Sequence, residues 1–474
     1  MRVCKSVVIT EVEAFGQNIL TPGKAITATH ETRFYHVRFL FAIPLQSFAV
    51  RLLPPFAEGS APTVEWLFLD LNSYFASVEQ QERPELRGRP IGIVPLITEH
   101  TCCIAASYEA KVYGVKTGIN VEEAKQLCPH LQLVEARPKL YVEYHRRIVE
   151  AVNSCIPVTH VMSVDEMACR LMGRERALPN ATTIAVDIKQ ALRTIGDTLR
   201  CSVGLAPNRY LSKIASDLCK PDGLTVFLLR DLPQALYCLK LSDLVGVGHA
   251  MEKRIHNSGI TTVEQLCQLS PGQMRGIWNS VLGERLWHWL RGVDFHDPEF
   301  KRKSLGKQHV LAPKYRTREQ AFCVALKLLH ISAANLRKLK MWAGGIGSVV
   351  EFLKKRPTRF GSEGVDVPTW KAHMRIHECR DTVILQRHLT KLWNSCPAQE
   401  PLQVGVWLFN LVPDELHTLS LFEDDEKRYR ISMVADELNQ RYGQNAVYFG
   451  GIHSVLDSAP TRISFTSIPD LDDF

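Results

Sequence analysis

Three carboxylates in two short segments are the residues of this sequence best placed to do chemistry. Asp70 follows an apolar run that begins at Trp66, and Asp165 and Glu166 stand next to each other in a second short apolar stretch. Three carboxylates at one site would repel one another unless cations lay between them. Hard divalent cations such as Mg²⁺ prefer oxygen ligands and take further ligands from phosphates. If the two segments converge, they predict a site for two-metal phosphoryl or nucleotidyl transfer.

Each acidic segment alone also has an ordinary structural explanation. An Asp after an apolar run is more often a turn residue or a helix N-cap than a metal ligand. An adjacent Asp and Glu more often form part of a solvated surface, as the looseness of short motifs implies. The elements around the two segments therefore have to decide between these alternatives.

Cysteine and histidine offer no competing metal site. The thirteen cysteines contain no Cys-x-x-Cys pair, and Cys102 and Cys103 are expected to lie in a core. His373 and His377 have a spacing that could place two ligands on a helix. Because neither a cysteine pair nor a directly following Glu accompanies them, we expect both to be exposed or structural.

Length and composition indicate a multidomain protein of a reducing compartment. A chain of 474 residues suggests about three or four domains, and 45% apolar residues suffice for sizeable cores. The formal charge of +7 is compatible with an anionic partner but does not require one. An odd number of cysteines without paired spacing argues against a secreted disulfide framework and predicts a cytoplasmic protein. No uncharged apolar stretch of about 18 residues exists, so we expect no membrane-spanning helix.

Strands and helices alternate from residue 65 to about residue 240. The run 66–70 has the character of a buried strand that delivers Asp70 to the end of a sheet. Residues 1–60 fit no clear element. Further expected strands are 90–94, 102–106 and 201–205, and expected helices are 141–152, 182–195 and 208–218.

The pattern changes after residue 241. A glycine-rich turn at 244–248, a basic helix at 251–257 and a second turn and helix at 259–266 resemble a helix–hairpin–helix. The exposed backbone N–H groups of such a motif can hold a phosphate backbone without reading bases. A basic linker at 301–307 leads into a mixed region. That region carries an expected helix at 318–340 and expected strands at 347–353 and 402–409, before a charge-rich tail.

Taken in order, these motifs resemble those of a Y-family translesion DNA polymerase. The resemblance covers roughly residues 65–411. It rests on the segments 70–79, 106–111, 163–166 and 202–208, the last continuing through 213–223. Asn72 stands where many members have Asp, which favours the UmuC-type branch over the DinB-type branch.

The resemblance implies an α+β multidomain fold with the right-hand architecture of polymerases. A ferredoxin-like palm would carry small fingers, a helical thumb with the helix–hairpin–helix, and an α/β little finger that binds DNA. Residues 1–64 would be an N-terminal extension of unknown role, and we expect residues 1–60 to be dispensable for catalysis. The implied domains are the palm at 65–240 with inserted fingers at about 82–140, the thumb at 241–300, the little finger at 301–411 and a C-terminal tail at 412–474.

Position within the motifs also implies roles for single residues. Asp70, Asp165 and Glu166 would be the catalytic, metal-binding carboxylates, and the carbonyl of Leu71 a further metal ligand. Phe75 would be the steric gate, whose ring occupies the space of a ribonucleotide 2′-OH. Plain core packing is the alternative for Phe75.

Three further residues would hold the triphosphate, namely Tyr108, Lys111 and Lys220. Lys111 departs from the arginine that is usual in the family. Lysine keeps the charge but loses bidentate geometry, so triphosphate affinity can differ. The alternative for Lys220 is a solvated loop lysine.

The implied activity is low-fidelity, lesion-bypass DNA synthesis on a primer 3′-OH, with roles in DNA repair, damage tolerance and the SOS response. Two Mg²⁺ per site, which Mn²⁺ can replace, would serve as cofactors. Primer–template DNA and deoxynucleoside triphosphates would be the partners, in the bacterial cytoplasm or nucleoid and without a membrane. A polymerase-shaped scaffold with weak catalysis, or a nucleotide cyclase on a palm-like fold, are the competing interpretations.

The tail contains a short apolar segment, Thr418–Phe422, followed by four acidic residues. It resembles the pentapeptide by which bacterial polymerases dock on the sliding clamp, with Thr418 in place of the usual Gln. Leu421 and Phe422 would be the anchors in an apolar pocket. An ordinary strand is the alternative. Accessory subunits are a further expected kind of partner.

Overall fold

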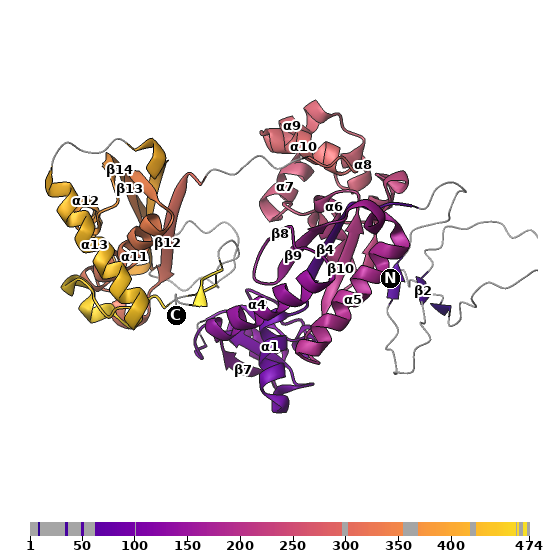
Figure 1. Cartoon of the computed structure of the whole chain (residues 1–474), viewed down its shortest axis with the longest axis horizontal. Coiled ribbons are helices and arrows are strands. Elements are labelled where there is room, and N and C mark those ends of the chain that lie inside the picture. The colour runs from indigo at the N-terminus through magenta and orange to yellow at the C-terminus, as the bar shows by residue number, and fades with distance from the viewer. Residues whose placement is uncertain are drawn as a thin grey trace, which may run out of the picture. The chain divides into compact units, whose positions relative to one another are not determined.

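The computed structural model describes two compact units of the chain (Figure 1). Unit 1 comprises Met1–His296 with Ile463–Ile468, and unit 2 comprises Asp297–Arg462 with Pro469–Phe474. Each unit is described by itself. Complete residues are described at 62–99, 101–295, 302–353, 368–417, 430–460, 462–463 and 468–471, and the backbone alone at 8–9, 34–36, 49–51 and 423–429.

The described residues of unit 1 form an eight-stranded sheet in the order β1-β2-β3-β11-β10-β4-β9-β8. Strand β4 lies between β9 and β10 and is antiparallel to both. Strand β10 is parallel to β11. The strands are β1 (Val8–Ile9), β2 (Phe34–His36), β3 (Ala49–Arg51), β4 (Trp66–Leu71), β8 (His160–Val161), β9 (Glu166–Arg170), β10 (Cys201–Ala206) and β11 (Leu224–Val226).

Strand β4 is buried along its whole length because helices cover both of its faces. Successive side chains of a strand point to opposite faces of the sheet. Leu67, Leu69 and Leu71 join a large core with apolar residues of α4 (Pro138–Cys155) and α5 (Leu178–Ile195). The opposite face therefore carries the alternate residues of β4, and Asp70 is one of them.

Helix α6 (Arg209–Leu218) lies against the face of the sheet that carries Asp70. A Cβ atom on Gly204 of β10 would lie 2.0 Å from the backbone oxygen of Ser212, so only glycine allows this approach. Asn208 caps the helix by accepting a hydrogen bond from the Leu211 N–H at 2.8 Å. Close packing of α6 on β10 thus brings polar helix residues to the end of β4.

The segment expected to form the fingers makes a small layer of its own. Its three-stranded sheet has the order β6-β5-β7, with β5 parallel to β7 and antiparallel to β6. Val94, Cys103, Ala110 and Val121 belong to its separate core. The elements are β5 (Ile91–Val94), β6 (Ala105–Ala106), α2 (Tyr108–Val112), α3 (Val121–Leu127) and β7 (Gln132–Glu135). Helix α1 (Tyr74–Glu82) precedes them and belongs to the main core of unit 1.

The expected helix–hairpin–helix forms a helical cluster at the end of unit 1. Gly246 and Gly259 have φ angles of +84° and +82° in its two turns, a conformation that favours glycine. Its core is continuous with apolar residues of α6. The helices are α7 (His249–Asn257), α8 (Val263–Cys267), α9 (Pro271–Trp278) and α10 (Val281–Trp289).

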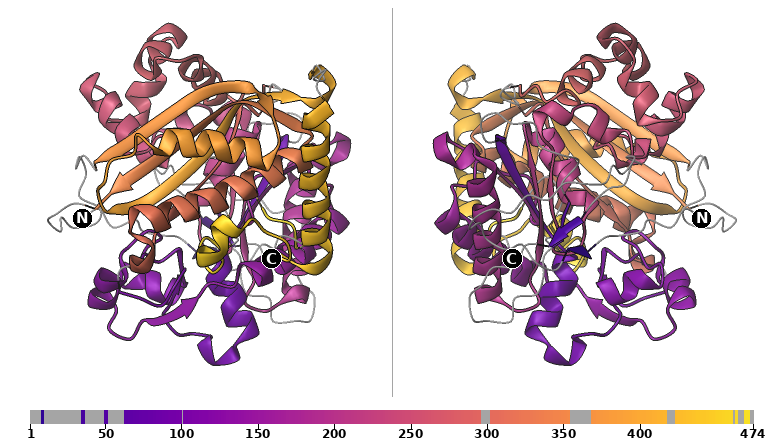
Figure 2. Two further views of the ribbon diagram at one scale, coloured as in Figure 1. Left: turned by 90° about the vertical axis from the view of Figure 1, so that its left-hand side faces the viewer. Right: turned by 90° about the vertical axis from the view of Figure 1, so that its right-hand side faces the viewer.

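The described part of unit 2 contains a four-stranded antiparallel sheet in the order β12-β15-β13-β14. Helices α11 and α12 lie on one face of this sheet (Figure 2) and share a core with it. Strand β12 alternates between exposed and half-buried residues. The elements are β12 (Ser304–Val310), α11 (Arg318–Lys338), β13 (Met341–Phe352), β14 (Thr369–Cys379), α12 (Thr382–Trp393), β15 (Pro401–Pro413) and α13 (Glu423–Tyr442).

The structure differs from the sequence-based expectations at several places. The segment 1–60 contributes three short strands, and β3 pairs with β11. The segment expected as a charged tail contains α13 and a 3₁₀ helix, η8 (Gly450–Val455), whose Ile452 and Val455 lie in the core of unit 2. His373 and His377 lie on β14, which was not expected as a strand, and both are exposed as predicted. In the part of the chain that is described, no helix has the length and apolar character to span a bilayer.

Candidate active site

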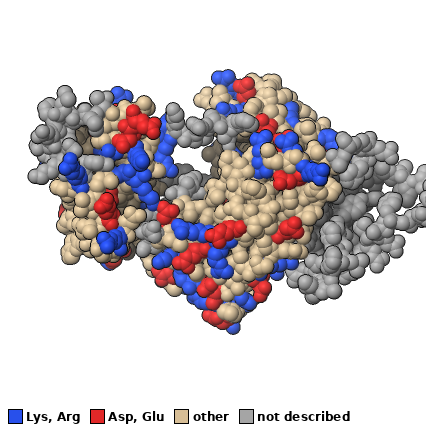
Figure 3. Space-filling view, viewed as in Figure 1, with Lys and Arg blue, Asp and Glu red and all other residues tan. Residues whose placement is uncertain are grey.

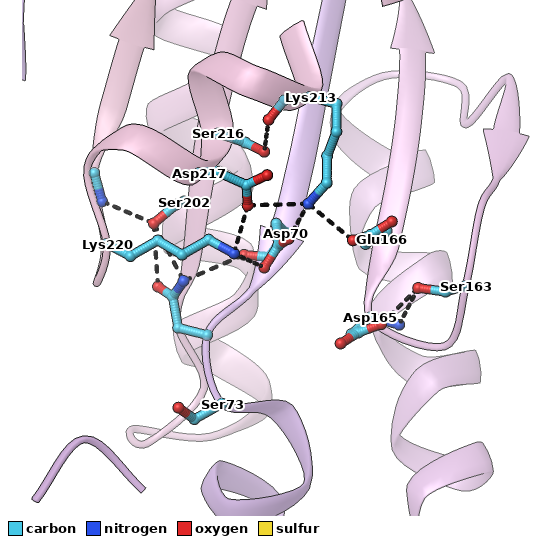
Figure 4. Close-up of polar contacts among 12 residues, drawn as sticks. Asp70, Ser73, Ser163, Asp165, Glu166, Ser202, Lys213, Ser216, Asp217 and Lys220 are labelled. Carbon is cyan, nitrogen blue, oxygen red and sulfur yellow. Dashed lines mark hydrogen bonds and ion pairs between the residues drawn. The ribbon is translucent and has the colours of Figure 1, made fainter. Parts of the chain in front are cut away.

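Asp70 and Glu166 meet at one end of β4, and Asp165 lies directly before β9, next to Glu166 (Figure 4). Asp70 and Glu166 are direct partners on antiparallel strands, so their side chains lie on the same face of the sheet. The N–H of Leu71 donates a hydrogen bond of 2.8 Å to the backbone oxygen of Asp165, which ties the second acidic segment to β4. The side chain of Asp165 accepts a hydrogen bond of 2.5 Å from Ser163.

Two lysines bridge these carboxylates. The Lys213 Nζ lies 2.6 Å from Asp70 Oδ2 and 2.8 Å from Glu166 Oε1. The Lys220 Nζ lies 2.7 Å from Asp70 Oδ1. Asp217 Oδ1 contacts both lysines, at 3.0 Å and 2.8 Å. Figure 4 shows the two ammonium groups on either side of Asp70.

The electrostatics reflect this concentration of charge. Burial raises the pKa of Asp165, and the nearby Asp70 carboxylate raises it further. Burial also raises the pKa of Glu166, while Lys213 opposes that effect. For Lys213 burial opposes the charged form, but Asp70, Asp217 and Glu166 together raise its pKa above the usual value. Burial thus disfavours the charged forms of Asp165 and Glu166, while the surrounding carboxylates favour the charged form of Lys213.

The donor set fits a hard divalent cation, because every candidate ligand is an oxygen and positive charge is in short supply. In the described ranges no group of three or more His, Cys, Asp or Glu side chains stands ready to hold a metal. The Lys213 ammonium group lies between Asp70 and Glu166. A bound cation would have to displace that ammonium group from its position between the two carboxylates.

Helix α2 of the fingers brings Tyr108 and Lys111 to the same region. The Lys111 Nζ donates a hydrogen bond of 2.7 Å to Ser73 Oγ, in the turn that follows β4. The Lys111 ammonium also lies 4.5 Å from the centre of the Tyr108 ring. Burial raises the pKa of Tyr108 to about 12, with a contribution from Asp70. Burial lowers the pKa of Lys111, and Lys220 lowers it further.

The ring of Phe75 is half-buried at the start of α1. It stacks on the ring of Tyr141 from α4, with centroids 4.4 Å apart and planes inclined by 14°. Phe75 also packs against the main core of unit 1. The residue is therefore part of the core on one side and accessible on the other.

The turn that carries Lys220 is held by buried polar side chains. Asn72 Oδ1 accepts a hydrogen bond of 2.7 Å from the Asp222 N–H. Lys189, which is 3% exposed, donates to the Asp222 backbone oxygen at 2.7 Å and to its carboxylate at 2.8 Å. These contacts fix Asp222 at a φ angle of +56°. Asn72 thus has a structural role in positioning Lys220.

Two residues of this site had no role in the sequence-based analysis, namely Lys213 and Asp217. Both lie in the matched segment 213–223, and their spacing of four residues places them on one face of α6. That spacing was the available signal. Their contact with Asp70 depends on the packing of α6 against β10, which no local pattern specifies.

One further prediction falls outside the described part of the chain. The proposed clamp segment Thr418–Phe422 lies outside the described residues. Basic and acidic side chains are interspersed over the part of unit 1 where α1 and β7 lie (Figure 3), so this face presents no uniformly basic surface.

Comparison with known proteins identifies the family. Residues 69–217 match the family model described as impB/mucB/samB family, and residues 242–294 match that of the thumb domain of DNA polymerase iota. DNA polymerase IV of Moorella thermoacetica is 34% identical over 391 residues, which cover 81% of this chain and 94% of the relative. DNA polymerase IV of Pelotomaculum thermopropionicum is 31% identical, over 80% of this chain and 93% of the relative.

Solved structures agree on the fold. A Y-family DNA polymerase chimera that includes Dbh aligns with a TM-score of 0.61 and 23% identity, over 74% of this chain and 99% of the chimera. The insertion ternary complex of Dbh DNA polymerase aligns with a TM-score of 0.50 and 22% identity. The expected right-hand architecture is confirmed. The UmuC-type branch stays a prediction, since the relatives above are named DNA polymerase IV. With a relative matched over nearly its full length, the chain belongs to the Y family of DNA polymerases.

Proposed function

We propose that this chain is a template-directed DNA polymerase of the low-fidelity, lesion-bypass type, which adds deoxynucleotides to a primer 3′-OH. One observation carries the proposal: Asp70 of β4 and Glu166 of β9 lie side by side next to two lysines, and Asp165 directly precedes β9. The relatives named DNA polymerase IV support the same activity. A role in DNA repair and damage tolerance follows from the lesion-bypass assignment.

Asp70, Asp165 and Glu166, with the carbonyl of Leu71, would hold two Mg²⁺ ions, for which Mn²⁺ can substitute. When bound, the cations would lower the pKa of the primer hydroxyl and offset the charge of the departing pyrophosphate. The protein contributes positioning, because the antiparallel pairing of Asp70 and Glu166 fixes two of the carboxylates side by side. The raised pKa values of Asp165 and Glu166 are consistent with a site that needs added positive charge.

Tyr108, Lys111 and Lys220 would bind the triphosphate of the incoming nucleotide. Their support is geometric: Lys111 reaches Ser73 from α2, and Lys220 reaches Asp70 from the turn after α6. Phe75 would act as the steric gate and exclude a 2′-OH by contact. Its half-buried ring leaves one side accessible for that contact.

Primer–template DNA would bind through the helix–hairpin–helix and unit 2. The turn at Gly246 is open, with no atom near a Cβ position, so its backbone can approach a phosphate. The Gly259 N–H donates to the backbone oxygen of His256 at 2.9 Å. Docking of Thr418–Phe422 on a sliding clamp would raise the local concentration of the enzyme at the primer end. We extend the proposal to accessory subunits and to action in the bacterial cytoplasm or nucleoid.

Primer extension by the purified full chain tests the proposal. We expect extension with Mg²⁺, none after chelation, and recovery when Mg²⁺ or Mn²⁺ is restored. Asp165→Ala or Glu166→Ala should abolish extension and leave DNA binding largely intact, while Glu150→Ala on the exposed face of α4 serves as the control. Wild-type-like extension by either active-site variant would reject the metal assignment. DNA binding by the wild type without extension would favour the scaffold interpretation.

A further inference from the structure

The stack of Phe75 on Tyr141 has a specific geometry that general core packing does not require. The two rings are nearly parallel, with centroids 4.4 Å apart. Among the described residues, the ring contacts of Phe75 are with Tyr141 and its neighbour Tyr74. The ring of Tyr141 therefore covers one face of the Phe75 ring.

Tyr141 is itself held at both ends. Its hydroxyl donates a hydrogen bond of 2.8 Å to Glu79 Oε1, and its backbone oxygen accepts one of 2.6 Å from the Tyr74 hydroxyl. Its side chain is almost completely buried, at 1% exposure. A ring with its hydroxyl bonded and its backbone tied to a second helix cannot rotate without breaking buried contacts.

Glu79, which accepts the hydrogen bond from Tyr141, is itself held in place by two arginines. It is 0% exposed, and Arg137 binds it through two nitrogens, at 3.0 Å and 2.6 Å. Arg83 adds a third contact at 2.6 Å. Charge-assisted, bidentate contacts of this kind are short and directional. The chain of contacts therefore runs from two arginines through Glu79 and Tyr141 to the face of Phe75.

We propose that Tyr141 is a positioning residue for sugar selection, which holds the Phe75 ring against the C2′ position of the incoming nucleotide. The inference rests on the proposed role of Phe75 as the steric gate. A gate discriminates only if it does not move aside when a 2′-OH presses on it. A half-buried phenylalanine ring can tilt away from such contact unless a second surface lies behind it, and Tyr141 supplies that surface.

The test compares two tyrosines of the same helix. Tyr144 follows Tyr141 by three residues on α4 and is 5% exposed. Its hydroxyl donates a hydrogen bond of 2.6 Å to Glu82. Tyr141→Leu and Tyr144→Leu thus each remove a buried phenol that is bonded to a glutamate. The measured quantity is the ratio of kcat/KM for a deoxynucleotide to that for the matching ribonucleotide, from single-nucleotide incorporation.

We expect Tyr141→Leu to lower this ratio by about 3- to 10-fold, as the loss of one aromatic stack implies. Tyr144→Leu should leave the ratio unchanged, even if both variants lose stability. Tyr141→Phe retains the ring and should keep most of the discrimination. Equal ratios for Tyr141→Leu and Tyr144→Leu would overturn the inference. If both leucine variants fail to fold, Glu79→Gln, which weakens the bond that holds the Tyr141 ring, is compared with wild type. A lowered ratio is then expected, and a ratio equal to that of wild type would overturn the inference.

Phe75→Ala separates this inference from the proposed function. If Phe75 is the gate, Phe75→Ala should lower the ratio by more than Tyr141→Leu does, and the double variant should match Phe75→Ala. An unchanged ratio in Phe75→Ala, with active enzyme, would reject the gate itself. A lowered ratio in Phe75→Ala and additive effects in the double variant would keep the gate and reject the positioning role of Tyr141.

Discussion

Two buried carboxylates of unit 1, Glu79 and Asp70, each bind two basic side chains, but the basic residues differ in kind. Glu79 contacts Arg83 and Arg137, both at 2.6 Å. Asp70 contacts Lys213 and Lys220, at 2.6 Å and 2.7 Å. The two carboxylates are almost equally buried, at 0% and 6% exposure. Burial and distance therefore do not distinguish them.

The difference lies in how the positive groups can be exchanged. A guanidinium binds a carboxylate through a planar fork, so Arg137 fixes the orientation of Glu79 as well as its charge. An ammonium group is a point charge that another cation can replace. Lys213 also contacts Asp217, so it keeps a partner if a cation displaces it from Asp70 and Glu166. Glu79 with its two arginines is therefore suited to stabilise the fold. Asp70 with its two lysines is suited to exchange an ammonium group for another cation.

The largest effect that this comparison predicts is on catalysis at Asp70. Asp70→Asn should reduce primer extension by about 10³-fold or more, because charge stabilisation at the reacting centre is lost. The free energy of unfolding should change by less than the corresponding substitution at Glu79 changes it, since Lys213 and Lys220 retain Asp217. Extension kinetics and denaturant unfolding of the same preparation measure both quantities. If Asp70→Asn is strongly destabilised but still extends primers, Asp70 stabilises the fold rather than serving catalysis, and the comparison with Glu79 fails.

The next largest effect is on stability at Glu79. Glu79→Gln should destabilise unit 1 by about 3 kcal/mol, because two arginines and the Tyr141 hydroxyl lose a buried charged partner. The Mg²⁺ concentration that gives half-maximal extension should stay the same. Urea unfolding and a Mg²⁺ titration test the two statements. A shifted Mg²⁺ requirement would show that Glu79 belongs to the metal site after all.

A smaller effect is expected on cation affinity. Lys213→Met should bind Mn²⁺ about tenfold more tightly in the absence of DNA, because an ammonium group no longer competes for Asp70 and Glu166. Calorimetric titration measures this without relying on activity. Lys125→Met, which removes an exposed lysine paired with Glu99 on the fingers, is the control. Unchanged or weaker binding in Lys213→Met would contradict the idea of an exchangeable cation.

The smallest expected effect concerns the departure from the family pattern at Lys111. Lys111→Arg should lower the KM for the incoming deoxynucleotide by about threefold, since a guanidinium can contact two phosphate oxygens. The value of kcat should change little. Steady-state incorporation measures both constants. A higher KM would indicate that the contact of Lys111 with Ser73 requires the compact ammonium group.

Much of the fold could be predicted from local patterns. The end of β4 at Leu71, one residue after Asp70, and helices such as α6 and α11 follow from hydrophobic periodicity and capping residues. Helix α5 begins at Leu178, four residues before the expected start, because Pro179 suits the first turn of a helix. The core residues Ile452 and Val455 were missed, since they stand among polar residues without a regular period.

The carboxylates could be predicted because each lies in a recognisable segment. The basic side chains that form ion pairs with them could not. Lys213 is separated from Asp70 by 143 positions, and Arg137 from Glu79 by 58. Which basic residue reaches which acid depends on helix packing, such as the approach of α6 to Gly204. Local sequence contains the charged groups but not their pairing. The roles of the site residues therefore stay predictions until the variants above are measured.

The alternation along β4 also determines which genetic changes this enzyme can tolerate. Leu67 and Leu69 face one side of the sheet, and Asp70 faces the other. Adding or deleting one codon between Trp66 and Asp70 would rotate the remaining strand by half a turn relative to its neighbours. A leucine would then stand where the carboxylate belongs, and the carboxylate would enter the core. We expect evolving variants to accept length changes in the loops, and to accept none within these few codons.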